Sequence, residues 1–227
     1  MTSPRDMDNE VGEAISAFKS GRPVMIYDSD YREMETDLLW HAAAATPEVI
    51  RRLRNDCGGL LFLAIGNEIG EMFGLPWLQD IHSHKSLVEE NPVLGHLVTN
   101  DLQYDSRSAF TLSLNHRETY TGITDRDRSL TTRRFGELSE ELIVKGEDGA
   151  RAKERLGKEF RTPGHIPVCR ESPGGLKTRQ GHTELAVSIA RLAGLTSCTI
   201  GAEMLEPDGD GALSVEGART YTKRHGI

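Results

Sequence analysis

The 227-residue sequence contains few cysteines, and they are widely spaced. Cys57, Cys169 and Cys198 form no C-x-x-C pair, and an odd number of thiols cannot complete a disulfide framework. A disulfide-rich secreted protein and a zinc site built from thiolates are therefore both disfavoured. We expect the three cysteines to be core residues of a protein from a reducing cytoplasm.

Positive charge and long apolar runs are also scarce. The 27 Lys and Arg residues are outnumbered by 35 Asp and Glu residues, which gives a formal charge of −8. No basic tract is present to contact a phosphate backbone, so nucleic acid is not an expected partner. The longest apolar run, Leu60 to Ile65, is far shorter than the roughly 20 residues that span a bilayer. Because the N-terminus is also too acidic for a signal peptide, we expect a cytoplasmic protein with no membrane association.

The first third of the sequence alternates between helix and strand patterns. Helical spacing of apolar residues predicts a helix over Val11 to Lys19, and the short apolar run Val24 to Tyr27 predicts a buried strand. A second helix, Pro47 to Arg54, begins with the N-cap pattern of Thr46 followed by proline, and precedes a predicted strand at Leu60 to Ile65. No internal repeat or low-complexity linker interrupts the chain, so we expect one α/β domain over residues 1–227.

The alternation continues after a middle segment, residues 67–107, which predicts no clear element although it holds three histidines. Ser108 to Leu114 predicts a half-buried strand, and the charged stretch Glu137 to Phe160 predicts a solvated helix or loop. Further predictions are a helix from the loop at Arg179–Thr183 through Leu192, a strand from Ser197 that ends at Glu203, and a last helix over Val215 to Lys223.

The first group of residues that could carry chemistry follows the strand at Val24 to Tyr27. Six ionisable side chains lie between Asp28 and Asp37. In an extended backbone Glu33, Glu35 and Asp37 would point to the same side, where carboxylates can bind a hard cation and move protons. Arg32 beside them could bind an anion. A solvated acidic loop would show the same charges, so this pattern alone does not establish a site.

The second group is Arg179-Gln180-Gly181-His182-Thr183 at the predicted start of a helix. Free backbone N–H groups and the helix dipole favour an anion there, while Arg179 adds a bidentate donor and Thr183 a hydroxyl. The segment therefore predicts a phosphate site, with His182 placed to bind a metal beside it. An ordinary helix cap is the alternative interpretation.

The third group is His165 and Glu203, each at the edge of a predicted strand. Either residue alone would more often be structural or solvated. The sequence has no G-x-S-x-G, no G-x-x-x-x-G-K-[ST] and no G-x-G-x-x-G motif, which argues against a serine hydrolase or a P-loop protein.

Taken together, these segments resemble the 3,4-dihydroxy-2-butanone 4-phosphate synthases of riboflavin biosynthesis, from about Val11 to His225. The most specific similarities are Pro163-Gly164-His165, the segment from Pro173 through Thr178 to Glu184, and Glu203 at its spacing from His182. Residues 32–37 resemble the family's Arg-Glu-x-Glu-Gly-Asp loop, with Met34 and Thr36 where many members have Asn and Gly. Thr121 to Arg128 resembles Thr-Gly-x-Ser-x-x-Asp-Arg, with Thr124 in place of Ser. No GTP cyclohydrolase II domain is seen, so the monofunctional form is expected.

The resemblance implies a three-layer α/β/α fold with a mixed sheet, and a homodimer with active sites at the subunit interface. It implies a lyase that converts D-ribulose 5-phosphate to 3,4-dihydroxy-2-butanone 4-phosphate and formate through a metal-stabilised enediolate. Carbon 4 is lost as formate, and the cofactor is magnesium or manganese, one or two ions per site. By position, the implied metal ligands are Glu33 and His182, and the catalytic residues are His165, Glu203, Glu35 and Asp37. The implied substrate contacts are Arg32, Glu33, Asp37, Arg179, Gln180, Gly181, His182, Thr183 and Glu203.

Two other functions remain open at this stage. A metal-dependent phosphosugar isomerase or aldolase would share the enediolate and stop before carbon is lost. A non-catalytic phosphosugar- or nucleotide-binding relative would bind its ligand and release no product. The residues do not determine which carboxylate takes the first proton, nor whether Cys57 or Cys169 is redox-sensitive.

Overall fold

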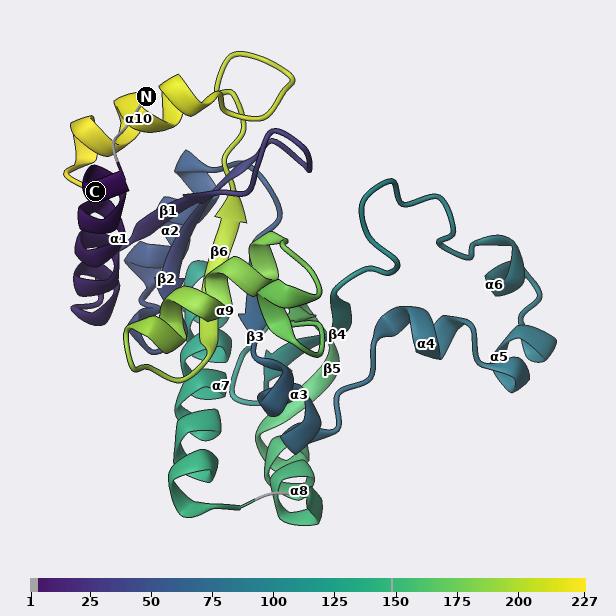
Figure 1. Cartoon of the computed structure of the whole chain (residues 1–227). Helices are drawn as coiled ribbons and strands as arrows, with labels where there is room; N and C mark the ends of the chain where they lie inside the picture. Colours follow the sequence, from purple (N-terminus) through teal and green to yellow (C-terminus); the bar gives the residue numbers. More distant parts are fainter. Residues whose placement is uncertain (1–3, 148) are drawn as a thin grey trace.

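A mixed six-stranded sheet organises the residues described by the computed structural model, 4–147 and 149–227 (Figure 1). The strand order is β1-β2-β6-β3-β5-β4; β3 and β5 run parallel, and the other neighbouring pairs are antiparallel. The expected mixed sheet is therefore confirmed. The strands are β1 (Val24–Tyr27), β2 (Thr36–His41), β3 (Phe62–Ile65), β4 (Phe110–His116), β5 (Phe160–Arg170) and β6 (Cys198–Glu203).

Helices cover both faces of the sheet, which confirms the three-layer arrangement (Figure 1). Alternate residues of β2 enter different cores: Leu38 belongs to the core that includes residues of α2, α3, α7 and α8, and Leu39 belongs to the core that includes residues of α1 and α9. The helix bounds are α1 (Pro4–Lys19), α2 (Pro47–Asp56), α3 (Asn67–Phe73), α4 (Leu78–His82), α5 (Lys85–Glu90), α6 (Val93–His96), α7 (Asp125–Lys145), α8 (Gly149–Glu159), α9 (His182–Leu192) and α10 (Val215–His225), with 3-10 turns at Ala42–Ala44 and Gly175–Lys177.

The middle segment without a predicted element forms α3, which packs into the core through Ile69 and Phe73, and then the short helices α4, α5 and α6, which extend to one side of the sheet (Figure 1). None of the helices α4, α5 and α6 has a fully buried residue, which explains the weak apolar periodicity of most of this segment. Its histidines, His82, His84 and His96, lie at helix ends and do not join the site described below.

Several predicted elements are confirmed with shifted bounds. Thr46 caps α2 by accepting the N–H of Val49 at 3.3 Å, as the Thr-Pro pattern predicted. β1 has the predicted bounds but is an edge strand, and only Val24 is fully buried. In β4 the pairing shifts between Phe110 and Ser113, so Phe110 is 38% exposed and the predicted single apolar face begins only at Leu112.

The three cysteines are buried and free, as predicted. Burial raises the pKa of the Cys57 thiol, and it raises the pKa of Cys169 and of Cys198 to about 12. These thiols are therefore protonated at neutral pH and behave as core residues. Among the described helices, none is long and apolar enough to cross a bilayer.

Candidate active site

The loop between β1 and β2 brings the acidic residues together by a tight turn. Asp28 accepts hydrogen bonds from the backbone N–H groups of Glu33, at 2.9 Å, and Glu35, at 3.1 Å. Met34 between them has a left-handed backbone (φ 56°), which is unfavourable for a residue with a side chain of this kind. The prediction of a continuous extended segment from Glu33 to Asp37 is therefore wrong, because the backbone turns at Met34 and the strand begins only at Thr36.

His182, the first residue of α9, is nevertheless where these acidic residues converge. Its Nδ1 lies 3.3 Å from Glu33 Oε2, and its Nε2 lies 3.1 Å from the carbonyl oxygen of Glu35 and 3.6 Å from Asp37 Oδ1. Burial opposes a charge on His182, but the hydrogen bond to Glu33 and the nearby carboxylates outweigh burial and raise its pKa to about 9. The same hydrogen bond lowers the pKa of Glu33 to about 2.

Three further carboxylates of the cluster have raised pKa values, in contrast to Glu33. Asp37 and Glu203 are paired across β2 and β6, and Asp37 is fully buried. Burial raises the pKa of Asp37 and of Glu203, and Asp37 is raised further by the charge of Glu203. Burial and the charges of Glu33 and Glu203 raise the pKa of Glu35. The cluster thus holds one firmly ionised carboxylate beside three that bind protons more readily, a division suited to acid–base chemistry.

Arg179 lies on the other side of His182, at the entrance to α9. Its Nη1 donates to Glu184 Oε2 at 2.6 Å, and Glu184 is fully buried and also accepts the N–H of Ser172. A Cβ on Gly181 would lie 2.2 Å from Arg179 Nη1, so this position needs glycine for the guanidinium to pack against it. Arg179, Thr183 and the N–H groups of the first turn of α9 lie together at the start of this helix, where the sequence predicts an anion site. Gln180 of the same predicted group is exposed to solvent.

A cavity of about 230 Å³ connects the acid cluster to the anion site. Of the predicted residues, Glu33, Arg179, His182, Thr183 and Glu203 line it. The Asp37 carboxylate and the backbone carbonyl of Glu35 lie next to the His182 imidazole. Arg32 donates a hydrogen bond to Asp105, which lines the cavity. The structure thus brings together most of the residues that the sequence singled out from three separate segments.

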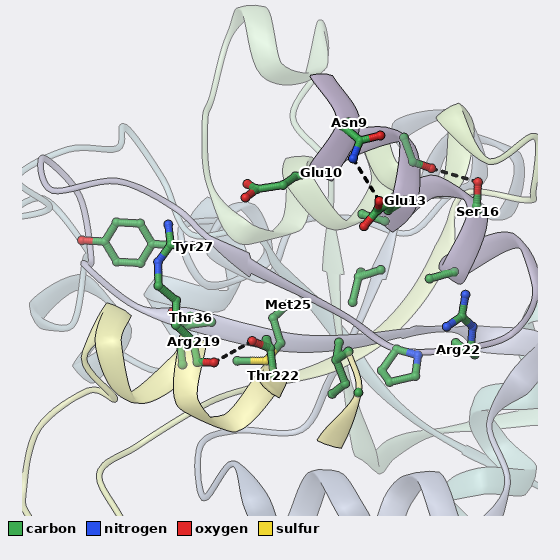
Figure 2. A pocket seen from close by; sticks show the side chains of 18 of the residues that line it. Asn9, Glu10, Glu13, Ser16, Arg22, Met25, Tyr27, Thr36, Arg219 and Thr222 are labelled. Atoms are coloured by element: carbon green, nitrogen blue, oxygen red, sulfur yellow. Dashed lines mark hydrogen bonds between the residues drawn. The ribbon is translucent and has the colours of Figure 1, made fainter. Parts of the chain in front are cut away.

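A larger hollow of about 1000 Å³ lies elsewhere, along β1 between α1 and α10 (Figure 2). Asn9, Glu10 and Glu13 of α1 line one wall, and Arg219 and Thr222 of α10 line another. None of the predicted site residues lines this hollow. The smaller cavity is therefore the candidate active site, because it is the one that contains the convergent titratable groups.

His165 is the predicted catalytic residue that the fold does not bring to this cavity. It lies in the middle of β5, four residues before Cys169, which does line the cavity; at about 3.3 Å per residue the separation is roughly 13 Å. The side chain of His165 is exposed and lies 3.1 Å from the amide of Asn115, which in turn contacts the carbonyl oxygen of Thr121. His165 and the 121–128 motif therefore form a second cluster on the surface of the same chain.

Three residues of the site were not singled out by sequence reasoning. Asp28 was only one of several acids in its loop. Tyr104 and Asp105 come from the segment with no predicted element, yet both line the cavity. Tyr104 lies under the Arg32 guanidinium, 4.8 Å from ring centre to Cζ. Only the fold could reveal this contribution, because no local pattern marks residues 97–109 as part of a site.

The acid cluster fits a divalent cation. Asp28, Glu33 and His182 each offer one ligand atom, and these atoms lie within 4.8 Å of one another. Neither oxygen of the buried Asp37 carboxylate has a hydrogen-bond partner among the described residues. Carboxylate oxygens with one imidazole nitrogen suit magnesium or manganese.

An acid–base cluster with the donor set of a cation site, joined by one cavity to a helix N-terminus with a paired arginine, is the kind of site found in α/β enzymes that act on anionic substrates. Comparison with known proteins identifies the family. Residues 12–227 match the profile of 3,4-dihydroxy-2-butanone 4-phosphate synthase, and the chain belongs to this family of lyases. The resemblance inferred from the motifs is thereby confirmed.

Individual relatives agree with this assignment. The 3,4-dihydroxy-2-butanone 4-phosphate synthase of Methanosarcina mazei is 40% identical over 97% of this chain and 87% of its own length. The solved structure of the Candida albicans enzyme is 28% identical, with a TM-score of 0.70 over 96% of this chain and 90% of that one. A further solved structure of such a synthase, in complex with two magnesium ions, has 24% identity, a TM-score of 0.70 and the same coverage, and supports the fold.

Proposed function

We propose that this chain, as a single cytoplasmic domain over residues 1–227, converts D-ribulose 5-phosphate to 3,4-dihydroxy-2-butanone 4-phosphate and formate. The observation that carries the proposal is one cavity shared by His182, with its surrounding carboxylates, and Arg179 at the start of α9. The first group supplies proton transfer, and the second binds the phosphate that identifies the substrate.

Substrate binding starts at the anion site. Arg179, the Thr183 hydroxyl and the first N–H groups of α9 bind the phosphate, and Arg32 contributes a second guanidinium. Arg179 is held in place by the fully buried Glu184, so its guanidinium is oriented before substrate arrives. With the phosphate fixed, the carbonyl end of the sugar extends toward His182 and Glu203.

Proton transfer is assigned to the carboxylates with raised pKa values. Deprotonation beside the sugar carbonyl gives an enediolate, and the later elimination, rearrangement and loss of carbon 4 each move further protons. The pKa values of Glu35, Asp37 and Glu203 are raised above that of a solvated carboxylate. These side chains can therefore accept and return protons in turn. Glu33, with its low pKa, stays ionised throughout.

Glu33 and His182, joined by Asp28, are the residues that would hold magnesium or manganese, as one or two ions. When bound, the cation stabilises the negative charge that develops on the oxygens of the enediolate. The synthase structure in complex with two magnesium ions supports this cofactor. His182 would have to be neutral to act as a metal ligand, so its imidazole would have to lose the proton that the surrounding carboxylates favour.

We further propose that the chain acts as a homodimer with an active site at each interface. His165 is exposed, and it lies on β5 outside the cavity that contains the other predicted catalytic residues. In an isologous dimer an exposed residue of one subunit can complete the site of its partner. The exposed Tyr120 and Ile123, 94% and 51% accessible in the single chain, flank the same cluster and would be covered by the partner.

Removing divalent cations is expected to abolish formate release from ribulose 5-phosphate. The purified protein is treated with EDTA, assayed for formate and for substrate loss, and assayed again after magnesium or manganese is added back. Restored formate release would support the proposal. Metal-dependent substrate loss without formate would instead indicate an isomerase or aldolase, and no turnover with any metal would indicate a binding protein.

A further inference from the structure

The loop that follows α6, residues 97–109, returns from the projecting helices to the site. Its Tyr104 and Asp105 line the cavity together with Arg179 and His182. The Asp105 side chain is only 8% exposed, although most residues around it in the loop are exposed or half-buried. The loop therefore places one almost buried carboxylate in the part of the cavity where the guanidinium groups of Arg32 and Arg179 lie.

Asp105 contacts both of the arginines assigned to the substrate. Its Oδ2 accepts from Arg32 Nη2 at 2.6 Å and from Arg179 Nε at 2.8 Å, and it lies 2.8 Å from Arg179 Nη2. Nε and Nη2 form one edge of the Arg179 guanidinium, the kind of edge that grips a phosphate with two parallel hydrogen bonds. One oxygen of Asp105 therefore occupies the donors that a phosphate would need.

The local charges make simultaneous binding unfavourable. Arg32 and Arg179 carry two positive charges, and the carboxylates of Asp28, Glu33, Asp105 and Glu184 already lie within 4 Å of them. A phosphate monoester adds a charge of about −1.5 to −2 at neutral pH. If it bound Arg179 while Asp105 remained in place, the two anions would lie in direct contact in a largely buried site. Glu184 cannot make room, because it is fully buried on α9 and fixed by the N–H of Ser172.

We propose that Asp105 is a resident anion that holds Arg32 and Arg179 until the phosphate of the substrate replaces it. This inference rests on the proposed function, since it assumes that the anion site binds the phosphate of a sugar. Displacement moves the 97–109 loop, and with it Tyr104, away from the cavity. A sugar without phosphate has no charge with which to displace Asp105, so the residue acts as a specificity determinant for phosphorylated substrates.

Inorganic phosphate tests this competition without any turnover. We expect Asp105→Asn to bind phosphate at least about fivefold more tightly than the wild type by calorimetry, because a competing charge is removed and the shape is kept. Asp101→Asn, an exposed position of the same loop, is the matched control and should leave the affinity unchanged. Arg179→Gln should remove phosphate binding in both backgrounds, which assigns the signal to this site.

Equal or weaker phosphate binding by a folded Asp105→Asn variant would overturn the proposal and would show that Asp105 only positions the arginines. Asp105→Ala serves as the second variant and should also bind phosphate more tightly than the wild type. Formate assays on the same wild-type protein test the synthase reaction separately from the role of Asp105. Tighter phosphate binding without formate release would leave Asp105 as the resident anion and reject the synthase reaction.

Discussion

Replacing His182 by alanine should reduce kcat/KM for formate release by roughly a thousand-fold or more, because one side chain joins the cation site to the proton-transfer cluster. His182 contacts Glu33 on one side and Asp37 on the other. Without it, the buried Asp37 loses the imidazole that lies 3.6 Å from its carboxylate, and the proposed cation site loses its nitrogen ligand. Steady-state formate assays over a range of magnesium and manganese concentrations measure the loss.

Two comparisons separate this effect from misfolding. His84→Ala changes an exposed histidine on the projecting helices, and it should leave kcat/KM within a few-fold of the wild type. His182→Asn keeps a polar side chain of similar size in the buried position and should be almost as inactive as His182→Ala. Near wild-type turnover in a His182→Ala variant with an unchanged circular dichroism spectrum would refute the role given to this residue.

Mixing two inactive variants, His165→Ala and His182→Ala, should restore formate release. If His165 completes the site of the partner subunit, a mixed dimer contains one site in which both residues are present. Random reassortment of equal amounts makes half of the dimers mixed, so about a quarter of the wild-type activity is expected. The measurement is formate release after the subunits have been unfolded and refolded together.

The matched control combines His182→Ala with Arg179→Ala. Both residues line the same cavity of one chain, so every site of the mixed dimer has one defect and no recovery is expected. Failure of His165→Ala and His182→Ala to restore activity, with mixed dimers shown by native mass spectrometry, would place His165 outside the partner's site.

Local sequence was sufficient to predict the elements whose buried apolar residues are regularly spaced. α2 follows its Thr46 cap, and α9 follows the apolar spacing after Arg179, because these signals depend on neighbours in the chain. β2 was missed because its first residues, Thr36 and Asp37, continue the acidic composition of the loop before them. They become strand through pairing with the neighbouring β1 and with β6, and β6 lies far away in sequence.

β5 shows the same limit more strongly. The sequence predicts His165 at the edge of a strand, because Pro163, Gly164 and Pro167 are unfavourable in a strand interior, yet the strand runs from Phe160 to Arg170 with His165 in its middle. The pairing with β4 is shifted between Leu114 and Asn115, and a Cβ on Gly164 would lie 1.9 Å from the backbone of Leu114. The glycine is therefore required by the close approach of another strand, which no local pattern reveals.

The residues of the candidate site also fall into those that local motifs reveal and those that only the fold reveals. Residues in compact motifs, such as Glu33, Arg179 and His182, were found from sequence because several chemical groups occur close together. Tyr104 and Asp105 were not, since a single acid in an irregular loop carries no signal until the fold places it against two arginines. The position of His165 was also not predictable, because the role given to it depends on a second subunit.

The fate of carbon 4 of the substrate tests the central claim most directly. D-ribulose 5-phosphate labelled with ¹³C at carbon 4 is incubated with the protein and magnesium, and the products are followed by ¹³C NMR. The account predicts that the label appears in formate, together with an unlabelled four-carbon phosphate. Label that stays in a five-carbon sugar, or appears in a fragment other than formate, would contradict the synthase reaction for this chain.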